Sequence, residues 1–363
     1  MSDYVEKGRT ALQLRSVEDV VEHFQIDLDK FKIDRVRVGT WELPIKLGDD
    51  LVTHTSHQVR VDVKPRPQPF DYGVAFDEIE NYVRDRRRSI RRNRKERPDG
   101  GAGVVVFSDI HVGAKATTEK GIVATREFCL DTLIYYMEEM VRWVNACELS
   151  SVHVFGLGDF VESITGLNHL NSWQGMEEGA HGAGAIKLAS ELLRDMLSRI
   201  VNLDGVYLVS GNHDRLTSDK TLDSSGGAAE LVAWYLQACG LPIEYHPLII
   251  SKEIDGINYI ATHGHHSLIK KRITDLLWKY GKQGVYNVVL SGHLHSRQTK
   301  RYFFCDLFDE FLDDAVGHRG VVCPPMFTGN PYSEQLGYTS TAGFLFFESA
   351  AGGRNVLQVD VGL

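Results

Sequence analysis

Hydrophobic and polar positions alternate in the first part of the chain as they do in strands of a half-exposed sheet. The runs Arg35-Val36-Arg37-Val38 and Val59-Arg60-Val61-Asp62-Val63 place apolar side chains at every second position, which is the period of a strand. Val17–Phe24 has instead the spacing of a short helix. We therefore predict a small N-terminal α/β or β module over residues 1–70.

A proline-rich stretch and then a basic stretch follow, and we predict that residues 71–100 form a linker and a basic helix. Three prolines in five residues, Pro65–Pro69, favour extended backbone. From Arg84 to Arg97 nine Lys or Arg stand against two acids, a local net charge of +7 in a chain of net charge −9. Such a run is either a solvated helix or an arm that neutralises phosphates.

After the breaker cluster Pro98-Asp99-Gly100-Gly101, buried strands alternate with helices. This order predicts an α/β catalytic domain with parallel strands over residues 101–363. Further along, Asp255-Gly256 between two apolar runs predicts a hairpin. The predicted strands are Gly103–Phe107, Ser151–Leu157 and Val206–Ser210, and the predicted helices are Phe128–Cys147 and Ala185–Asn202.

Composition sets limits on the class of protein. Of the 363 residues, 43% are hydrophobic and 25% charged, which is ordinary for a soluble globular protein. The five cysteines are scattered and form no C-x-x-C pair, so neither a disulfide framework nor a zinc ribbon is indicated. The sequence begins without the apolar core of a signal peptide and has no run suited to a membrane helix. We expect a cytoplasmic protein that does not contact membranes, and homo-oligomerisation stays open.

Five short motifs rich in histidine and aspartate carry the candidate chemistry. Most of them directly follow an apolar run that is predicted to be a strand, and ligand crevices form at the carboxyl ends of strands in α/β sheets. Each motif alone is weak, but the five in series are specific. They are Asp109-Ile110-His111, Gly158-Asp159, Gly211-Asn212-His213-Asp214, His263-Gly264-His265-His266 and Gly292-His293-Leu294-His295.

The residue types in these motifs indicate a metal site. Carboxylate, imidazole and amide ligands without cysteine suit Mn²⁺, Fe²⁺ or Zn²⁺. Asp109 and His111 stand two apart, so an extended backbone would point both side chains the same way, and His293 and His295 repeat this spacing. His153 lies within a strand and is expected to be structural. The seven candidate ligands, more than one ion needs, are Asp109, His111, Asp159, Asn212, His263, His293 and His295.

The order D-x-H, G-D, G-N-H-D, H-G-H, G-H-x-H resembles the calcineurin-like metallophosphoesterase superfamily over about residues 103–300. Its spelling is closest to the DNA-repair exonuclease branch, and the arrangement is also similar to phage-type members. The resemblance implies a metallophosphoesterase-type four-layer α/β/β/α sandwich with two mixed sheets. Phe160-Val161-Glu162, which follows Asp159, departs from that branch and from the protein phosphatase branch.

The resemblance also implies roles for the site residues. Asp159 would bridge two ions, and a metal-bridging hydroxide would attack phosphorus. His213 would act on the leaving group as a general acid, and Asp214 would orient the His213 ring. The implied ligands are Asp109, His111, Asp159 and His295 for one ion, and Asp159, Asn212, His263 and His293 for the other.

The expected function is a two-metal phosphodiesterase, a nuclease acting on DNA, with Mn²⁺ as the expected metal and Fe²⁺, Zn²⁺ or Mg²⁺ as alternatives. The alternatives are hydrolysis of a small phosphoester, such as a nucleotide, cyclic nucleotide or phosphomonoester, and a non-catalytic metal-bound scaffold. The insert Glu162–Gly184 follows the bridging aspartate, where a loop is placed to set specificity. The candidate substrate contacts are His265, His169, Arg91 and Arg92.

Overall fold

The computed structural model divides the chain into two units, Met1–Ile79 and Glu80–Leu363. It describes residues 8–9, 17–47, 50–65, 94–96, 101–118, 126–168, 170–219, 227–265, 269–295, 318–330, 333–334, 340–349 and 356–363. Each unit is described by itself below.

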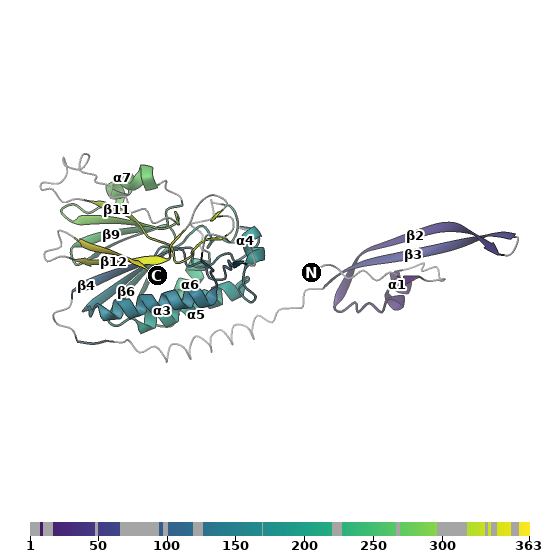
Figure 1. Ribbon diagram of the computed structural model, residues 1–363, viewed down its shortest axis with the longest axis horizontal. Coiled ribbons are helices and arrows are strands. Elements are labelled where there is room, and N and C mark those ends of the chain that lie inside the picture. Colours follow the sequence, from purple (N-terminus) through teal and green to yellow (C-terminus); the bar gives the residue numbers. More distant parts are fainter. Residues whose placement is uncertain are drawn as a thin grey trace. The chain divides into compact units, whose positions relative to one another are not determined.

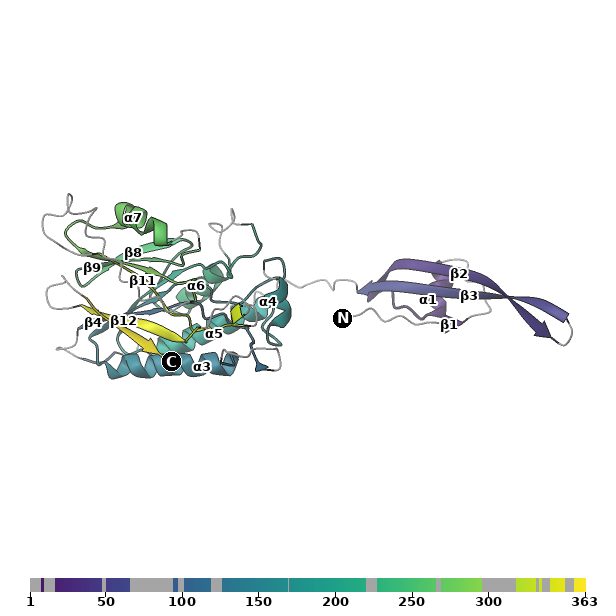
Figure 2. The same cartoon turned by 45° about the horizontal axis from the view of Figure 1, so that its top comes forward.

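Among its described residues, the first unit has a three-stranded antiparallel sheet and one helix. The strand order is β1 (Gly8–Arg9), β3 (Asp50–Pro65), β2 (Phe31–Leu47), and Figures 1 and 2 show β2 and β3 as one long hairpin. Val20 of α1 (Val17–His23) and Val59 of β3 are its buried apolar side chains within the described residues. The alternation noted above thus lies on paired strands with a small core.

The second unit contains two mixed sheets. In the six-stranded sheet, β4 to β7 run parallel, and β12 and β13 join antiparallel at one edge. In the four-stranded sheet, β9, β10 and β11 are parallel and β8 is antiparallel. The first order is β13 (Val356–Gly362), β12 (Gly343–Ser349), β4 (Ala102–Phe107), β5 (Ser151–Gly156), β6 (Leu203–Val209), β7 (Ile243–His246), and the second is β11 (Arg319–Val322), β10 (Tyr286–Ser291), β9 (Ile257–Thr262), β8 (Ile249–Ile254).

Helices cover the outer faces of both sheets. The helices α3 (Leu130–Ala146), α5 (Ala183–Arg199) and α6 (Ala228–Ala238) pack on the six-stranded sheet, and α7 (Ile269–Tyr280) packs on the other. The predicted four-layer α/β/β/α sandwich with two mixed sheets is therefore confirmed. No helix in the described part of the chain is long and apolar enough to cross a membrane.

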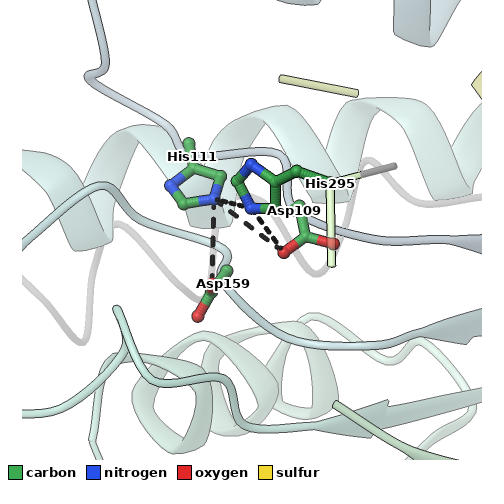
Figure 3. A group of neighbouring side chains, drawn as sticks. All are labelled: Asp109, His111, Asp159 and His295. Carbon is green, nitrogen blue, oxygen red and sulfur yellow. Dashed lines mark hydrogen bonds and ion pairs between the residues drawn. The ribbon is translucent and has the colours of Figure 1, made fainter. Parts of the chain in front are cut away.

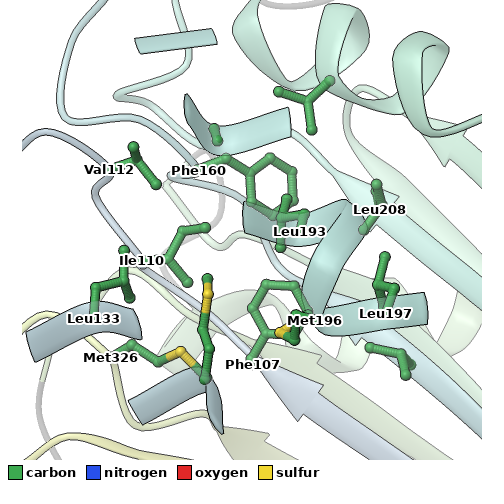
Figure 4. Close-up of a cluster of buried hydrophobic side chains, with 14 of the residues drawn as sticks. Phe107, Ile110, Val112, Leu133, Phe160, Leu193, Met196, Leu197, Leu208 and Met326 are labelled. Atoms are coloured by element: carbon green, nitrogen blue, oxygen red, sulfur yellow. The ribbon is translucent and has the colours of Figure 1, made fainter. Parts of the chain in front are cut away.

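Strand β4 shows why this sequence forms sheets that are covered on both faces. Val105 and Phe107 face the helices, where Figure 4 shows Phe107 among Leu133, Leu193 and other apolar side chains. Val104 and Val106 face the second sheet. A strand that is buried on both faces needs a continuous apolar run rather than alternation. Polar residues can then enter only where the strand ends.

The turn between β8 and β9 confirms the predicted hairpin. Asp255 and Gly256 have φ angles of 49° and 75°, and Ile254 pairs with Ile257 across them. Two central residues of positive φ match the twist of an antiparallel pair, which is why Asp-Gly is favoured there. This hairpin brings β9 into the sheet beside β10, and the histidine motifs follow these two strands.

Candidate metal centre

The five motifs come together at the carboxyl ends of the inner strands. Asp109 follows β4, Asp159 follows β5 and Asn212 follows β6, while His263 and His293 follow β9 and β10 of the second sheet. The two sheets are joined at this edge, because His263 Nδ1 donates a hydrogen bond to the carbonyl of Leu157, at 2.7 Å. The structure places these residues at the ends of strands, as predicted.

One group of donor atoms consists of four side chains, which Figure 3 shows turned toward one another. His295 Nε2 lies 3.2 Å from Asp109 Oδ1 and 3.3 Å from His111 Nε2. His111 Nε2 lies 3.9 Å from Asp109 Oδ1 and 3.7 Å from Asp159 Oδ2. Two carboxylates and two imidazoles therefore converge on one point.

A second group shares one member with the first. Asp159, His263 and His293 bring their ligand atoms within 4.8 Å of one another, and His263 Nε2 lies 3.2 Å from Asp159 Oδ2. Asn212 joins them, since its Oδ1 lies 3.0 Å from His263 Nε2. Asp159 is the residue common to both groups, which is the position that a bridging carboxylate occupies.

The centre is built on strained backbone. Five of the seven candidate ligands have left-handed φ angles, 52° at Asp109, 44° at His111, 53° at Asp159, 69° at His293 and 44° at His295. Such angles cost about 1–3 kcal/mol each for residues other than glycine and cluster at functional sites. The expectation of an extended backbone at the two D-x-H and H-x-H spacings is therefore wrong, because a left-handed turn at each residue aims these side chains instead.

Glycines in the motifs let the loops approach closely. A Cβ atom on Gly211 would lie 2.0 Å from Asp159 Oδ1, and one on Gly292 would lie 1.9 Å from Ser108 Oγ. Both distances are far inside van der Waals contact. The motifs therefore need glycine at these positions because neighbouring loops pack against their backbone, apart from any catalytic role.

The chemistry of the donor set fits divalent cations. Asp109 Oδ1 and Asp159 Oδ2 are buried and accept no hydrogen bond from the described residues. The nearest cationic partners of these two oxygens are the imidazoles of His295 and His263, each at 3.2 Å, and a metal cation between the two groups would compensate both buried carboxylates. Oxygen and nitrogen donors without thiolates suit borderline divalent ions. The residues present therefore fit the metal centre that their types predicted.

Charge within the centre shifts the pKa of its members. Burial alone would raise the pKa of Asp109, but the charge and hydrogen bond of His295, together with the charge of His263, lower it. Burial would likewise lower the pKa of His263, yet Asp159 raises it to about 9. Burial and the charge of His263 lower the pKa of His293 to about 4, so that the His293 imidazole is neutral at pH 7.

His213 belongs to neither of the two donor groups that share Asp159, but it lies next to them. Its side chain is 17% exposed, against 1% for His111 and His263. Its Nδ1 donates to the carbonyl of Glu162 at 2.7 Å, and its backbone N–H donates to Asp159 Oδ1 at 2.7 Å. The ring centroids of His213 and His111 are 4.5 Å apart. This histidine is thus next to the candidate metal ligands and partly exposed.

Asp214 has a different role from the one predicted. Its buried carboxylate accepts hydrogen bonds from four backbone N–H groups, those of Asp159, Phe160, Val161 and Gly211. Those bonds join the loop after β5 to the loop after β6. The Glu162 carbonyl, not Asp214, orients the His213 ring, because the carboxylate of Asp214 is turned toward the backbone.

Of the candidate substrate contacts, one lies near the donor groups and the others lie outside the described residues. His265 lies beside the second group, with its ring centroid 5.2 Å from that of His263 and 6.2 Å from that of His293. His169, Arg91 and Arg92 lie outside the described residues. His153 contacts Tyr207 within the sheet, away from the strand ends, as a structural residue would.

Glu162 is the residue that sequence reasoning missed. Its side chain is 5% exposed, and Oε2 lies 2.7 Å from His111 Nδ1. Burial would raise its pKa, but the hydrogen bond from His111 lowers it to about 2. The available signal is an acid three residues after Asp159, at the start of the insert Glu162–Gly184.

The insert after Glu162 is anchored to the same centre. Asn168 Nδ2 donates to the carbonyl of Asn212 at 2.9 Å, and Thr165 Oγ1 donates to the carbonyl of Leu216 at 2.8 Å. The insert contains the short helix α4 (Leu170–Gly175). It therefore borders the motif that carries Asn212 and His213, where a specificity loop was expected.

Comparison with known proteins adds the following. The family model described as calcineurin-like phosphoesterase matches residues 103–321, more than half of the chain. No match to a curated protein was found.

Solved structures that are similar to this chain include three phosphoesterases or predicted phosphoesterases. A protein of Streptococcus pneumoniae TIGR4 described as a predicted phosphoesterase is 15% identical over 72% of this chain and 97% of its own, with a TM-score of 0.30. The phosphoesterase YfcE of E. coli is 14% identical over 71% and 98%, with a TM-score of 0.30. The calcineurin-like phosphoesterase YfkN of Bacillus subtilis is 12% identical over 73% and 91%, with a TM-score of 0.31.

Proposed function

This chain belongs to the calcineurin-like phosphoesterase family and is a metal-dependent hydrolase, and we propose that it is a two-metal phosphodiesterase that cleaves nucleic acid, with DNA as the expected substrate. The observation that carries the proposal is the pair of donor groups that share Asp159, with His213 at their open side. A single structural ion would need only one such group.

The residues supply distinct parts of the chemistry. Asp109, His111, Asp159 and His295 would hold one ion, and Asp159, Asn212, His263 and His293 the other. Two divalent cations held there would polarise the phosphoryl oxygens and lower the pKa of water for attack. We propose Mn²⁺ as the native metal, because imidazole, carboxylate and amide donors together suit it.

His213 acts on the leaving group in this proposal. Its Nδ1 is held by the Glu162 carbonyl, so Nε2 is the atom that can carry a proton to a departing oxygen. The partial exposure of His213 lets a substrate reach its ring. General acid catalysis of this kind is worth about 10²–10⁴ in rate.

Nucleic acid is proposed as the substrate because of charge. The run Arg84–Arg97 carries +7 in a chain of −9, and basic arms bind nucleic acid by neutralising phosphates. Intact donor groups together with His213 stand against the scaffold reading. Membership of the exonuclease branch, cytoplasmic location and homo-oligomerisation stay predictions.

One observation favours the alternative of a small phosphoester. Arg94 pairs with Asp204 at 2.8 Å, and the Lys95 backbone N–H donates to Asn202 Oδ1 at 2.8 Å. Both partners lie at the amino end of β6, whereas Asn212 follows its carboxyl end. A seven-residue strand is about 23 Å long at the usual rise of about 3.3 Å per residue. The end of the basic run is therefore far from the metal centre.

Activity assays with matched substrates test the proposal. Mn²⁺-loaded protein is given labelled single- and double-stranded DNA, bis-p-nitrophenyl phosphate and p-nitrophenyl phosphate, beside an Asp159→Asn control. We expect the protein to cleave DNA and the model diester faster than the monoester, and the control to be inactive. Diester turnover without DNA cleavage would favour the small-molecule alternative, and no turnover of any ester would favour the scaffold.

A further inference from the structure

The backbone at Glu162 is fixed by hydrogen bonds to two neighbouring loops. Its own backbone N–H donates to the carbonyl of Val112 at 3.0 Å. The preceding residues Phe160 and Val161 donate to the carboxylate of Asp214. Neither the backbone nor the buried side chain can shift without breaking these bonds. The position of Glu162 is thus fixed to the loops that carry Asp159 and His111.

The carboxylate of Glu162 determines which nitrogen of His111 is available. A carboxylate can only accept, so His111 Nδ1 must carry the hydrogen in the 2.7 Å bond to Glu162 Oε2. His111 Nε2 then keeps its lone pair, and it is this atom that lies 3.7 Å from Asp159 Oδ2. An imidazole in the other tautomer would present a hydrogen to the metal site.

The same residue holds the second histidine. His213 Nδ1 donates to the backbone carbonyl of Glu162 at 2.7 Å and lies 3.7 Å from Glu162 Oε2. Both imidazoles therefore bond to Glu162 through Nδ1 and keep Nε2 for chemistry. The carboxylate also has a hydrogen bond to Ser172, which lies on α4 of the insert.

We propose that Glu162 is a positioning residue that fixes the tautomer and ring orientation of His111, and through its carbonyl those of His213, so that one metal ion is bound tightly. This inference rests on the proposed two-metal function. Outer partners of ligating histidines typically contribute 10–100-fold in metal affinity. Glu162 has no metal donor role of its own in this proposal, because its carboxylate is already bonded to the far side of the ring.

Metal titration of the metal-free protein tests the proposal without any substrate. Glu162→Leu keeps about the same size but removes the acceptor for His111 Nδ1, and it should weaken one of the two Mn²⁺ affinities by about 10–100-fold while leaving the other within a few-fold. Glu191→Leu is the matched control, since Glu191 bonds to Tyr235 and Arg194 on the helical face. Wild-type affinity at both sites in Glu162→Leu would overturn the proposal.

A spectroscopic measurement keeps the proposal testable if the variant fails to fold. Two-bond ¹H–¹⁵N correlation spectra of histidine-labelled wild-type protein at pH 8, with His111→Gln for assignment, report which ring nitrogen carries hydrogen. We expect hydrogen on Nδ1 of His111 and Zn²⁺ on Nε2. Hydrogen on Nε2 in the metal-free protein would refute the assignment. Since neither measurement uses a phosphoester, a failure of the nuclease proposal would leave both results unaffected.

Discussion

His263 Nε2 lies 3.2 Å from Asp159 Oδ2, and both side chains are 1% exposed. Burial would lower the pKa of His263, but the charge of Asp159 raises it to about 9. In the absence of metal, the imidazolium is thus the positive partner of the shared carboxylate at neutral pH. An ion that binds Asp159 and His263 must displace this proton.

The first prediction follows from that exchange of a proton for a metal ion. Because His263 binds metal only when it is neutral, the apparent affinity of its site should rise with pH up to about 9 and then level off. The slope should approach about tenfold per pH unit, as expected for one released proton. Chelator competition with Mn²⁺ between pH 6.5 and 9.5 measures it. A flat profile would contradict the assigned contact.

The second prediction concerns Asp159 as the shared residue. Asp159→Asn removes the negative charge that both donor groups use, so neither ion should be retained after desalting, and turnover should be lost. Asp204→Asn is the matched control, because Asp204 lies at the opposite end of the strands and pairs with Arg94. Elemental analysis counts the bound ions. If Asp159→Asn lost one ion and kept the other with wild-type affinity, the residue would not bridge.

The third prediction assigns Asp214 to stability. Asp214→Ala leaves four backbone N–H groups without their acceptor, and each buried unsatisfied group costs about 1–3 kcal/mol. We expect a loss of roughly 3 kcal/mol or more in the free energy of unfolding of metal-free protein, measured in urea. Asp195→Ala, at an exposed ion pair with Arg199, should cost less than about 1 kcal/mol. Equal effects of the two variants would argue against the loop-joining role.

Part of the fold and of the candidate site could be predicted from the sequence. The α/β domain could be predicted because strands such as β4 are buried on both faces and form unbroken apolar runs, whereas the four-layer sandwich was implied by the family resemblance. The candidate ligands could be proposed because parallel strands bring their carboxyl ends to one edge. Both signals are local in sequence and need only the periodicity of the chain.

The rest depends on contacts that periodicity does not encode. The left-handed φ angles at Asp109 and His111 belong to residue types that adopt them more often than most, but the spacing of the motif does not predict them. Glu162 and His111 are 51 positions apart, so no spacing rule connects them. Asp214 was assigned to the His213 ring because the family resemblance implied it, whereas three of its four hydrogen-bond partners lie 53–55 positions away.

The fourth prediction tests the close approach of two motif loops. Gly211→Ala would place a Cβ 2.0 Å from Asp159 Oδ1, so the carboxylate must move away from both donor groups. We expect both ions to bind about tenfold more weakly or worse, which corresponds to a loss of about 1.4 kcal/mol or more in binding free energy. Gly175→Ala is the control, because no atom lies within 4 Å of its Cβ position. Isothermal titration with Mn²⁺ compares the two variants, and unchanged affinity in Gly211→Ala would show that the loops can separate freely.

The fifth prediction separates His213 from the metal ligands. His213→Asn removes the proton donor but leaves both donor groups that share Asp159 intact, so the metal content should stay at the wild-type level. The turnover rate should fall by about 10²–10⁴ on DNA, whose alkoxide leaving group needs a proton. It should fall less on bis-p-nitrophenyl phosphate, because nitrophenolate departs readily without one. Parallel measurement of kcat on both substrates and of bound Mn²⁺ tests this. An equal loss on both substrates would assign His213 to stabilising the phosphoryl oxygens, and loss of metal would place it among the ligands.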